Sequence, residues 1–264
     1  MKTCPIFINS ADSFSDIWPV FFGLFKKYWP EWEGVIYLNT ENKDFQYEGL
    51  NIVCTKVGDL KTFGAEYRAG LDKIDSPYVM TMMIDYFFMG KVDNDKLESY
   101  YEYFLKEKLD TLCLVHQNYR EYKPTGNDDL LEVVPPSKDM FSYQISYWKK
   151  ETLYEMALPL EDPWLSEWYG TKRANIMRIK MACVKNGRNP IPYLITGALI
   201  KGKWEEESVE FLKAKNISVD FDKRGYHKDE PIPFGLKLKR RIKRFYPRCV
   251  SRMDLCARYL KRFF

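Results

Sequence analysis

The sequence predicts an α/β domain with a doubly wound sheet, and three observations support this fold class. Over the first 115 residues, short apolar runs and amphipathic stretches follow in the order β-α-β-β-α-β-α-β. The run Tyr78–Ile84 is almost continuously apolar, which is typical of a strand buried on both faces. The chain of 264 residues is 45% hydrophobic and 16% aromatic, enough to form a substantial core.

The first half supplies most of this pattern. Strands are predicted at 5–10, 34–40, 51–55, 78–84 and 111–115. Helices are predicted between them at 16–29, 62–74 and 94–107. The first helix has Ser15 as a cap and stops at Trp29-Pro30, and the second has Thr62 as a cap and one apolar face. A polar loop then runs through Pro135-Pro136.

The second half is less regular. A strand is predicted at 142–150, a short helix to about 157, a long helix from near Trp164 within 159–183, a strand at 192–200 and a helix at 204–215. Neither an internal repeat nor a low-complexity linker interrupts this pattern. We therefore expect one domain at 1–232, followed by a helical tail at 233–264.

The tail differs sharply from the body in charge. From Lys237 onward, eleven Lys and Arg accompany one acid, giving +10, whereas the preceding residues carry 30 basic and 36 acidic side chains, giving −6. Leu238, Ile242 and Phe245 form one apolar stripe, and a second stripe follows the expected break at Pro247: Val250, Met253, Ala257, Leu260 and Phe264. This pattern predicts an in-plane amphipathic helix that binds an anionic membrane surface through 236–264. Packing of the stripes on the acidic body is the alternative, and a nucleic-acid partner is not expected, because no known module is present.

Polar residues follow the predicted strands at the edge where open α/β sheets bind ligands: Ser10, Asp12, Asn39, Thr40 and Asp85. Asp85, at the end of the central strand, suits a divalent cation that bridges a diphosphate, because such cations prefer oxygen ligands. A turn-initiating aspartate that bonds its own backbone is the alternative.

The stretch EDPWLSEWYG (161–170) combines carboxylates with aromatic rings. Trp164 offers a face for a sugar ring, and Glu167 could act as a general base. The alternative is an ordinary helix start, with Asp162 before Pro163 and Glu167 near the helix N-terminus. Gln144 and Trp148 share one face of a predicted strand, where one could bind ligand and the other could pack.

Several function classes lack their sequence signatures. The chain has no GxSxG motif, no GxxxxGK[ST] loop and no CxxC pair. The six cysteines and the short apolar stretch at the N-terminus lead us to expect a cytosolic protein with reduced thiols.

Three stretches carry a resemblance to a known family: YRAGLDKIDSPYVMTMMIDYFF, QISYWKKETL and EDPWLSEW. Together with a first strand that ends in a polar loop, they resemble bacterial glycosyltransferases of the GT-A fold from polysaccharide and lipopolysaccharide biosynthesis clusters. The resemblance covers about residues 5 to 230. In that family the central strand typically ends in two acids before an aromatic residue, whereas here Ile84 precedes Asp85.

The resemblance implies a GT-A-type mixed sheet flanked by helices and the transfer of a sugar, with inversion, from a nucleotide-sugar to a cell-envelope glycan or lipid-linked acceptor. Glu167 would be the general base, with Asp162 as a second catalytic carboxylate. The remaining implied roles are donor binding by Ser10, Asp12, Arg68 and Asp85; acceptor or sugar binding by Gln144, Trp148 and Trp164; and metal binding by Asp85 and His227. The implied cofactor is Mn²⁺ or Mg²⁺. The Ile at position 84 counts against this cofactor, because it stands where the family typically has an acid.

Two other functions stay open. A nucleotidyltransferase would share the sheet, but NSADSFSD after the first strand has neither the Gly-rich loop nor the basic residue expected there. A catalytically degenerate member would bind nucleotide or glycan at the membrane, and the Ile at position 84 agrees with that. In each case we expect a peripheral protein on the cytoplasmic face of the cell membrane.

Overall fold

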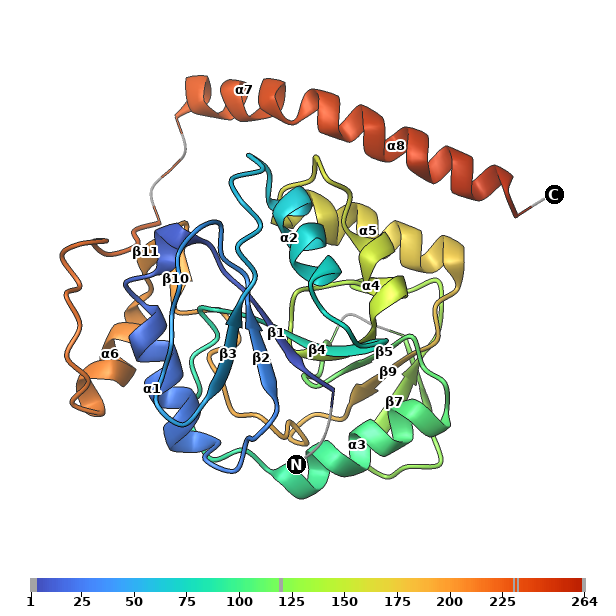
Figure 1. Ribbon diagram of the computed structural model, residues 1–264. Coiled ribbons are helices and arrows are strands. Elements are labelled where there is room, and N and C mark those ends of the chain that lie inside the picture. Colours follow the sequence, from blue (N-terminus) through green and yellow to red (C-terminus); the bar gives the residue numbers. More distant parts are fainter. Residues whose placement is uncertain (1–3, 119–120, 230, 232, 263–264) are drawn as a thin grey trace.

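The computed structural model describes residues 4–118, 121–229, 231 and 233–262 and contains one large mixed sheet flanked by helices (Figure 1). Within these residues the strand order is β3-β2-β1-β4-β8-β5-β9-β7-β6. The strands are β1 (Ile6–Asn9), β2 (Val35–Leu38), β3 (Asn51–Cys54), β4 (Tyr78–Met83), β5 (Thr111–Cys113), β6 (Tyr122–Pro124), β7 (Leu130–Val133), β8 (Ser146–Lys149) and β9 (Met181–Val184). The predicted fold class, a mixed α/β sheet flanked by helices, is confirmed.

The first four strands pair in parallel, and β8 inserts antiparallel between β4 and β5. The helices are α1 (Trp18–Tyr28), α2 (Phe63–Asp72), α3 (Asn94–Lys106), α4 (Lys150–Met156), α5 (Pro163–Met177), α6 (Glu206–Ala214), α7 (Phe234–Lys243) and α8 (Phe245–Leu260). A short hairpin, β10 (Leu199–Ile200) with β11 (Lys203–Trp204), follows the main sheet. The parallel half therefore delivers the carboxyl ends of β1, β2, β3 and β4 to one edge.

The strand expected to be buried on both faces is indeed central. Residues 79–82 of β4 are buried, and β1 is buried along its whole length. The aromatic residues of α1 pack on this part of the sheet, with Phe21, Phe25 and Phe88 in edge-to-face contact. Burial of these rings supplies the apolar area that stabilises the domain.

Some predicted elements of the second half are wrong. The helix expected within 159–183 ends at Met177, because Arg178 adopts a left-handed conformation with φ of 53°, and β9 begins three residues later. Of the strand expected at 192–200, only Leu199–Ile200 is a strand, and Tyr193 forms an isolated bridge with Phe88. β6 and β7 lie in the expected polar loop, where alternation was too short to be recognised.

The tail forms two helices that lie across the top of the molecule, above α2 and α5 (Figure 1). The break falls at Arg244 and not at Pro247, because a proline is tolerated in the first turn of a helix, where no intrahelical donor is needed. α8 packs along α5. No helix in the described parts of the chain is long and apolar enough to cross a membrane.

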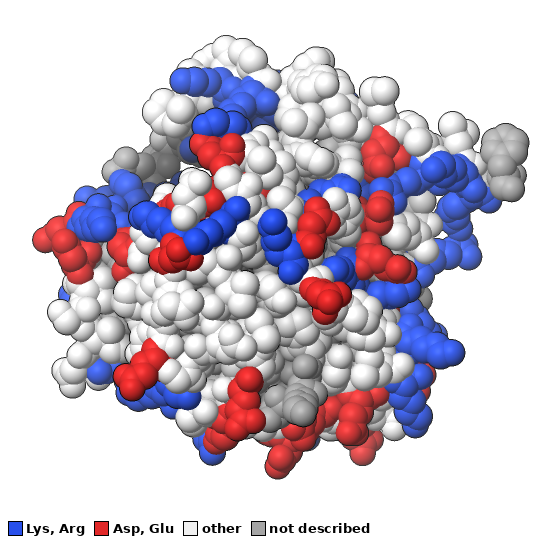
Figure 2. Space-filling view, in the orientation of Figure 1, with Lys and Arg blue, Asp and Glu red and all other residues white. Residues whose placement is uncertain are grey.

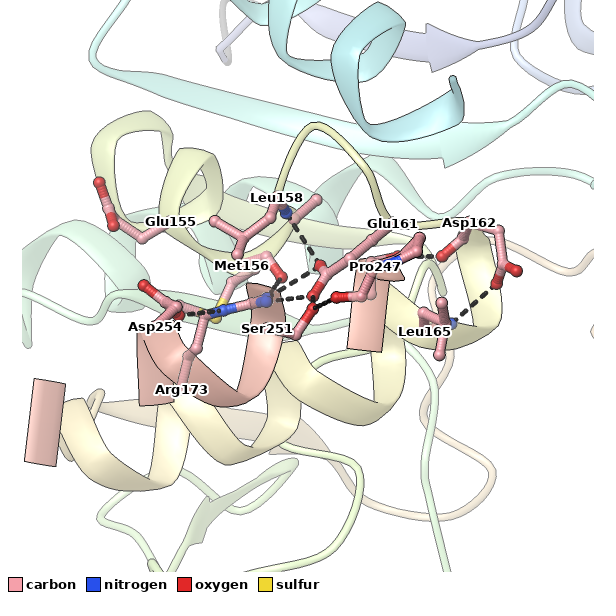
Figure 3. A network of polar contacts seen from close by, with 12 residues as sticks. Glu155, Met156, Leu158, Glu161, Asp162, Leu165, Arg173, Pro247, Ser251 and Asp254 are labelled. Atoms are coloured by element: carbon pink, nitrogen blue, oxygen red, sulfur yellow. Dashed lines mark hydrogen bonds and ion pairs between the residues drawn. The ribbon is translucent and has the colours of Figure 1, made fainter. Parts of the chain in front are cut away.

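Polar and charged side chains fix α8 to α5 (Figure 3). The fully buried Arg173 guanidinium donates to Glu161, to the Met156 carbonyl and to Asp254 of α8. Ser251 of α8 donates to Glu161 from the other side at 2.7 Å. The alternative expected from the sequence, packing of the tail through its apolar stripes, is not what these contacts show, because the α8 side chains that dock on the body are polar.

Candidate functional site

Polar side chains from three parallel strands meet at the carboxyl edge of the sheet. The Asn39 amide after β2 donates to the Asn9 side chain of β1 at 3.0 Å, and the Thr55 hydroxyl after β3 donates to Asn39 at 2.8 Å. Asn9, Asn39 and Thr55 are all buried. These residues therefore join the strand ends to one another.

Asp85 follows β4 directly and lies at this edge. Burial raises the pKa of its carboxyl group from 3.8 to about 6, and a hydrogen bond from its own backbone lowers it by less. No ion pair joins Asp85 to any described cation. A desolvated carboxylate without a cationic partner destabilises the fold, and such groups are common at functional sites.

Gly197 shapes the space beside Asp85. A Cβ atom at position 197 would lie 2.8 Å from Asp85 Oδ2, and the backbone φ of Gly197 is +81°. The next residue, Ala198, donates its backbone N–H to the Asp85 carbonyl at 2.7 Å. The segment before β10 is thus held against Asp85, and only glycine fits there without strain.

Gln144 connects two tyrosines next to Asp85. Its Oε1 accepts a hydrogen bond of 2.6 Å from the Tyr193 hydroxyl, and its Nε2 donates to the Tyr86 hydroxyl at 3.3 Å. The Tyr86 and Tyr193 rings lie 5.1 Å apart. The predicted binding residue Gln144 therefore lies at the strand edge, beside the residue that follows Asp85.

Glu167 reaches the same region from α5. Its Oε1 accepts a hydrogen bond of 3.0 Å from the Tyr143 backbone N–H. Burial raises the pKa of Glu167, this hydrogen bond lowers it, and the nearby Asp139 charge raises it further. A carboxylate with a raised pKa and a fixed position is suited to proton transfer near neutral pH.

The Tyr86 phenol lies near both carboxylates, Asp85 and Glu167. Burial is the main cause of its raised pKa, and the charges of Asp85 and Glu167 contribute to the same increase. Both carboxylates therefore lie close enough to one phenol to repel its anionic form. The structure brings together Asp85, Glu167 and Gln144, which lie 23 or more positions apart in the sequence.

The predicted donor residues Ser10 and Asp12 have partners within the protein. The Asp12 carboxylate accepts hydrogen bonds from the backbone N–H groups of Glu41 and Asn42, at 3.1 and 3.0 Å, and its own N–H donates to Glu41. Ser10 accepts a 2.7 Å hydrogen bond from the Trp18 ring nitrogen. These contacts hold the loops after β1 and β2 together at the site.

Two other predicted residues lie away from this group. Arg68 stacks its guanidinium on Tyr154 at 3.8 Å and donates to the Ala157 carbonyl, so it faces α4. Trp148 is 1% exposed and contacts Phe141 in the core. Of the pair Gln144 and Trp148, the first is at the site and the second packs.

Asp162 and Trp164 lie at the start of α5, under the tail. Asp162 caps the helix by accepting from the Leu165 N–H at 2.9 Å, and it pairs with Arg244 at 2.6 Å. Trp164 is 60% exposed, and the Arg244 guanidinium lies 5.4 Å from its ring. Asp162 thus has a structural role in capping and in holding the tail.

Asp85 and His227 are the residues predicted to bind a metal ion. His227 interacts with Asp229 at 3.2 Å. Among the residues that the structure describes, no group of three or more His, Cys, Asp or Glu side chains could hold a metal ion. Asp85 and His227 therefore belong to no such group within the described part of the chain.

Sequence reasoning missed three contributors: Gly197, Tyr193 and Tyr143. Tyr193 and Gly197 lay in a stretch predicted as a strand, where no pattern marks a ligand-facing residue. Tyr143 contributes a backbone N–H, which any residue type would supply. The glycine was the one usable signal, because an isolated glycine within an apolar run indicates close approach of another group.

Comparison with known proteins gives structural similarity at low identity. The chain is similar to S. aureus TarS 1-349 in complex with UDP-GlcNAc, with 13% identity, a TM-score of 0.46 and coverage of 83% of this chain and 68% of that one. It is also similar to UDP-glucose pyrophosphorylase complexed with UDP-glucose, with 10% identity, a TM-score of 0.47 and coverage of 73% and 92%. In another TarS 1-349 structure, the chain spans 58% of that protein's length, at a TM-score of 0.47 and 12% identity. No family model and no curated protein matches the chain. At these identities and TM-scores, neither a function nor a residue role follows from the matches.

Proposed function

We propose that this chain is a glycosyltransferase that moves a sugar from a nucleotide-sugar to a hydroxyl group of a cell-envelope glycan or lipid-linked acceptor. The observation that carries the proposal is that Asp85 and Glu167 both lie near the buried Tyr86. One carboxylate follows the central strand at the ligand-binding edge, and the other is held on α5 with a raised pKa. Two carboxylates in different surroundings suit a transfer reaction that needs one proton acceptor and one positioning group.

Glu167 acts as the general base in this proposal. It takes the proton of the acceptor hydroxyl while that oxygen forms a bond to the anomeric carbon, and the bond from that carbon to the nucleoside diphosphate breaks. The attack from the opposite face inverts the anomeric centre. The hydrogen bond from the Tyr143 N–H keeps the carboxylate in one orientation, so that less conformational freedom is lost at the reaction step.

Asp85, Gln144 and the two tyrosines position the sugar. Hydroxyl groups of a hexose can donate to a carboxylate and to the Gln144 side-chain carbonyl, and the buried aromatic rings exclude water from the reacting carbon. The steps described here are those of the protein's own side chains.

A donor panel tests this function. Full-length protein is heated with UDP-, GDP-, CMP- and dTDP-sugars, each with and without Mn²⁺, and the melting temperature is recorded. A ligand that binds the native state raises that temperature by linkage. We expect one nucleotide class to give a shift and to be turned over, with release of the nucleoside diphosphate. Formation of a nucleotide-sugar from a nucleoside triphosphate and a sugar phosphate would instead identify a nucleotidyltransferase.

The tail supports a membrane-bound acceptor. Its polar side is docked on the body, and its apolar side chains point outward: Leu238 is 47% exposed, Ile242 68%, Phe245 70% and Met253 72%. Lys and Arg side chains follow the tail across the upper part of the molecule, while a group of Asp and Glu lies at the lower edge (Figure 2). An apolar stripe with basic flanks suits insertion into an anionic leaflet, which would bring the carboxyl edge of the sheet to a lipid-linked substrate.

A further inference from the structure

A cavity of about 560 Å³ lies between the tail and the body. Its walls come from the N-terminal end of α2, the start of α5, the turn of the β10–β11 hairpin and the end of α7, all of which lie toward the tail (Figure 1). This volume falls within the range of ordinary ligand pockets. Neither Asp85 nor Glu167 lines it.

Basic side chains dominate the polar part of the cavity. They come from three separate segments: Lys61, Lys201, and the end of α7 with Arg240, Lys243 and Arg244. Two carboxylates also line it, but both are already neutralised: Glu161 by the buried Arg173, and Asp162 by Arg244.

Three of these cations are left without an anionic partner. Lys61 pairs with Asp59 outside the cavity lining. Lys201, Arg240 and Lys243 form no ion pair with any residue that the structure describes. Holding three like charges around one cavity raises its energy by mutual repulsion, and a polyanion would remove that cost.

The remaining wall is apolar and aromatic. It includes Phe63, Trp164 and Leu165. The exposed Trp164 ring gives a flat face for an organic group, and Arg244 lies over that ring. The cavity can therefore accommodate a molecule with an anionic end and an uncharged end.

We propose that this cavity binds the diphosphate group of an organic diphosphate ester. Two linked phosphoryl groups carry two to three negative charges, which matches the three uncompensated cations. Arginine and lysine side chains bind phosphoryl oxygens by charge-assisted hydrogen bonds, and no metal ion is required for that.

The cavity adjoins the site of Asp85 and Glu167 through two contacts. The β10–β11 hairpin begins after Ala198, which is bonded to Asp85, and it carries Lys201 at its turn. Phe63 in the cavity wall packs on Tyr143 at 5.2 Å, and the Tyr143 N–H is bonded to Glu167. Whether the diphosphate belongs to the sugar donor or to a lipid-linked acceptor rests on the proposed function, but diphosphate binding itself does not.

Calorimetric titration of the full-length protein with inorganic pyrophosphate, at fixed ionic strength, tests the cavity. The variant Arg240→Gln/Lys243→Gln removes two cavity cations from α7. The matched control, Lys237→Gln/Lys239→Gln, removes the same charge from the same helix, and neither residue lines the cavity. We expect the cavity variant to lose at least tenfold in affinity and the control to stay within about twofold of the unmodified protein. No binding by the unmodified protein, or equal losses in both variants, would overturn the proposal.

Two organic probes then distinguish the source of the diphosphate. UDP represents the nucleotide, and farnesyl diphosphate represents a soluble lipid diphosphate. Selective loss of UDP binding in the cavity variant assigns the cavity to the donor, and selective loss of farnesyl diphosphate binding assigns it to the acceptor; both outcomes support the inference. Pyrophosphate binding that survives while no nucleotide-sugar is turned over would reject the proposed function and leave the cavity site in place.

Discussion

Arg173 on α5 and Asp254 on α8 form an ion pair of 2.9 Å, in which the Arg173 side chain is fully buried. The same guanidinium also pairs with Glu161, whose side chain is fully buried as well. Two carboxylates from different segments thus share one cation, and Ser251 supplies a further donor to Glu161. The tail is therefore fixed to the body by a desolvated polar network, in which each charge depends on its partners.

Replacing Arg173 should strongly destabilise the protein. In Arg173→Ala the Glu161 carboxylate would stay buried without its cation, and we expect a loss of about 3–5 kcal/mol in the free energy of unfolding. Urea denaturation measures this loss. Arg252→Ala is the control, because Arg252 lies on α8 with an exposed side chain. A loss below about 1 kcal/mol in the free energy of unfolding of Arg173→Ala would show that the ion pairs between Arg173, Glu161 and Asp254 do not form in solution.

Substitution of Glu167 should separate catalysis from donor binding. Glu167→Gln keeps an acceptor for the Tyr143 N–H but cannot take a proton, so we expect kcat to fall by at least 100-fold, with little change in donor affinity. In the unmodified protein, kcat should fall as the pH drops through the raised pKa of Glu167. Steady-state transfer assays with the donor found in the panel check both results. Full activity in Glu167→Gln would exclude this residue as the base.

The carboxyl group of Asp85 should make stability depend on pH. Its pKa is about 6 in the folded protein and 3.8 as a model value, so folding favours the protonated form. The stability that the fold has with Asp85 protonated is fully present below about pH 4 and is lost as the pH rises through about 6, where the buried carboxyl group ionises. Asp85→Asn should remove this pH dependence. As the pH rises from about 4 to about 6, the melting temperature of the variant should therefore increase relative to that of the unmodified protein. Parallel curves for the two proteins would mean that Asp85 is well solvated.

A side chain at position 197 should disturb the Asp85 site specifically. In Gly197→Ala the new Cβ would lie 2.8 Å from Asp85 Oδ2, at a φ of +81° that alanine rarely adopts. Gly187→Ala is a matched control, because Gly187 has a φ of +76° with no atom within 4 Å of a new Cβ. Each variant should lose roughly 1–2 kcal/mol of stability through backbone strain. Thermal shift with the donor should show weaker binding in Gly197→Ala alone, and similar binding in both variants would contradict the proposed position of the ligand.

The parallel half of the fold could be predicted from the sequence because its strands are short, apolar and bounded by clear helix signals. The continuous apolar run of β4 marks a central strand, and the residues that follow such strands meet at one edge whatever their spacing in the sequence. This rule correctly located Asp85 at the edge. β8 lies within the strand predicted at 142–150, but its antiparallel insertion into the sheet could not be predicted, because it depends on partners far along the chain. β6 and β7 were not predicted, because they have only three and four residues.

The candidate site could be predicted only where a side chain acts at a strand or helix end. Glu167 and Gln144 come to the edge through the packing of α5 and β8, which the sequence pattern does not describe. Arg68 shows the opposite case: the family resemblance implied donor binding, but Tyr154 and the Ala157 carbonyl contact its guanidinium. The docking of α8 through polar side chains could not be predicted either, because a buried network of charges leaves no periodic pattern in the sequence.

The outward apolar face of α7 should control membrane binding. Ile242 and Phe245 are 68% and 70% exposed, and neither is needed for the polar docking of α8. In Ile242→Ser/Phe245→Ser we expect binding to anionic lipid vesicles to fall by tenfold or more, because about 1.5–3 kcal/mol is lost for each large apolar side chain that no longer enters the leaflet. Co-sedimentation measures the bound fraction. Leu105→Ser, which removes a 38% exposed apolar side chain from α3, should leave binding unchanged. Unaltered binding in the α7 variant would mean that this face covers another surface or remains in water.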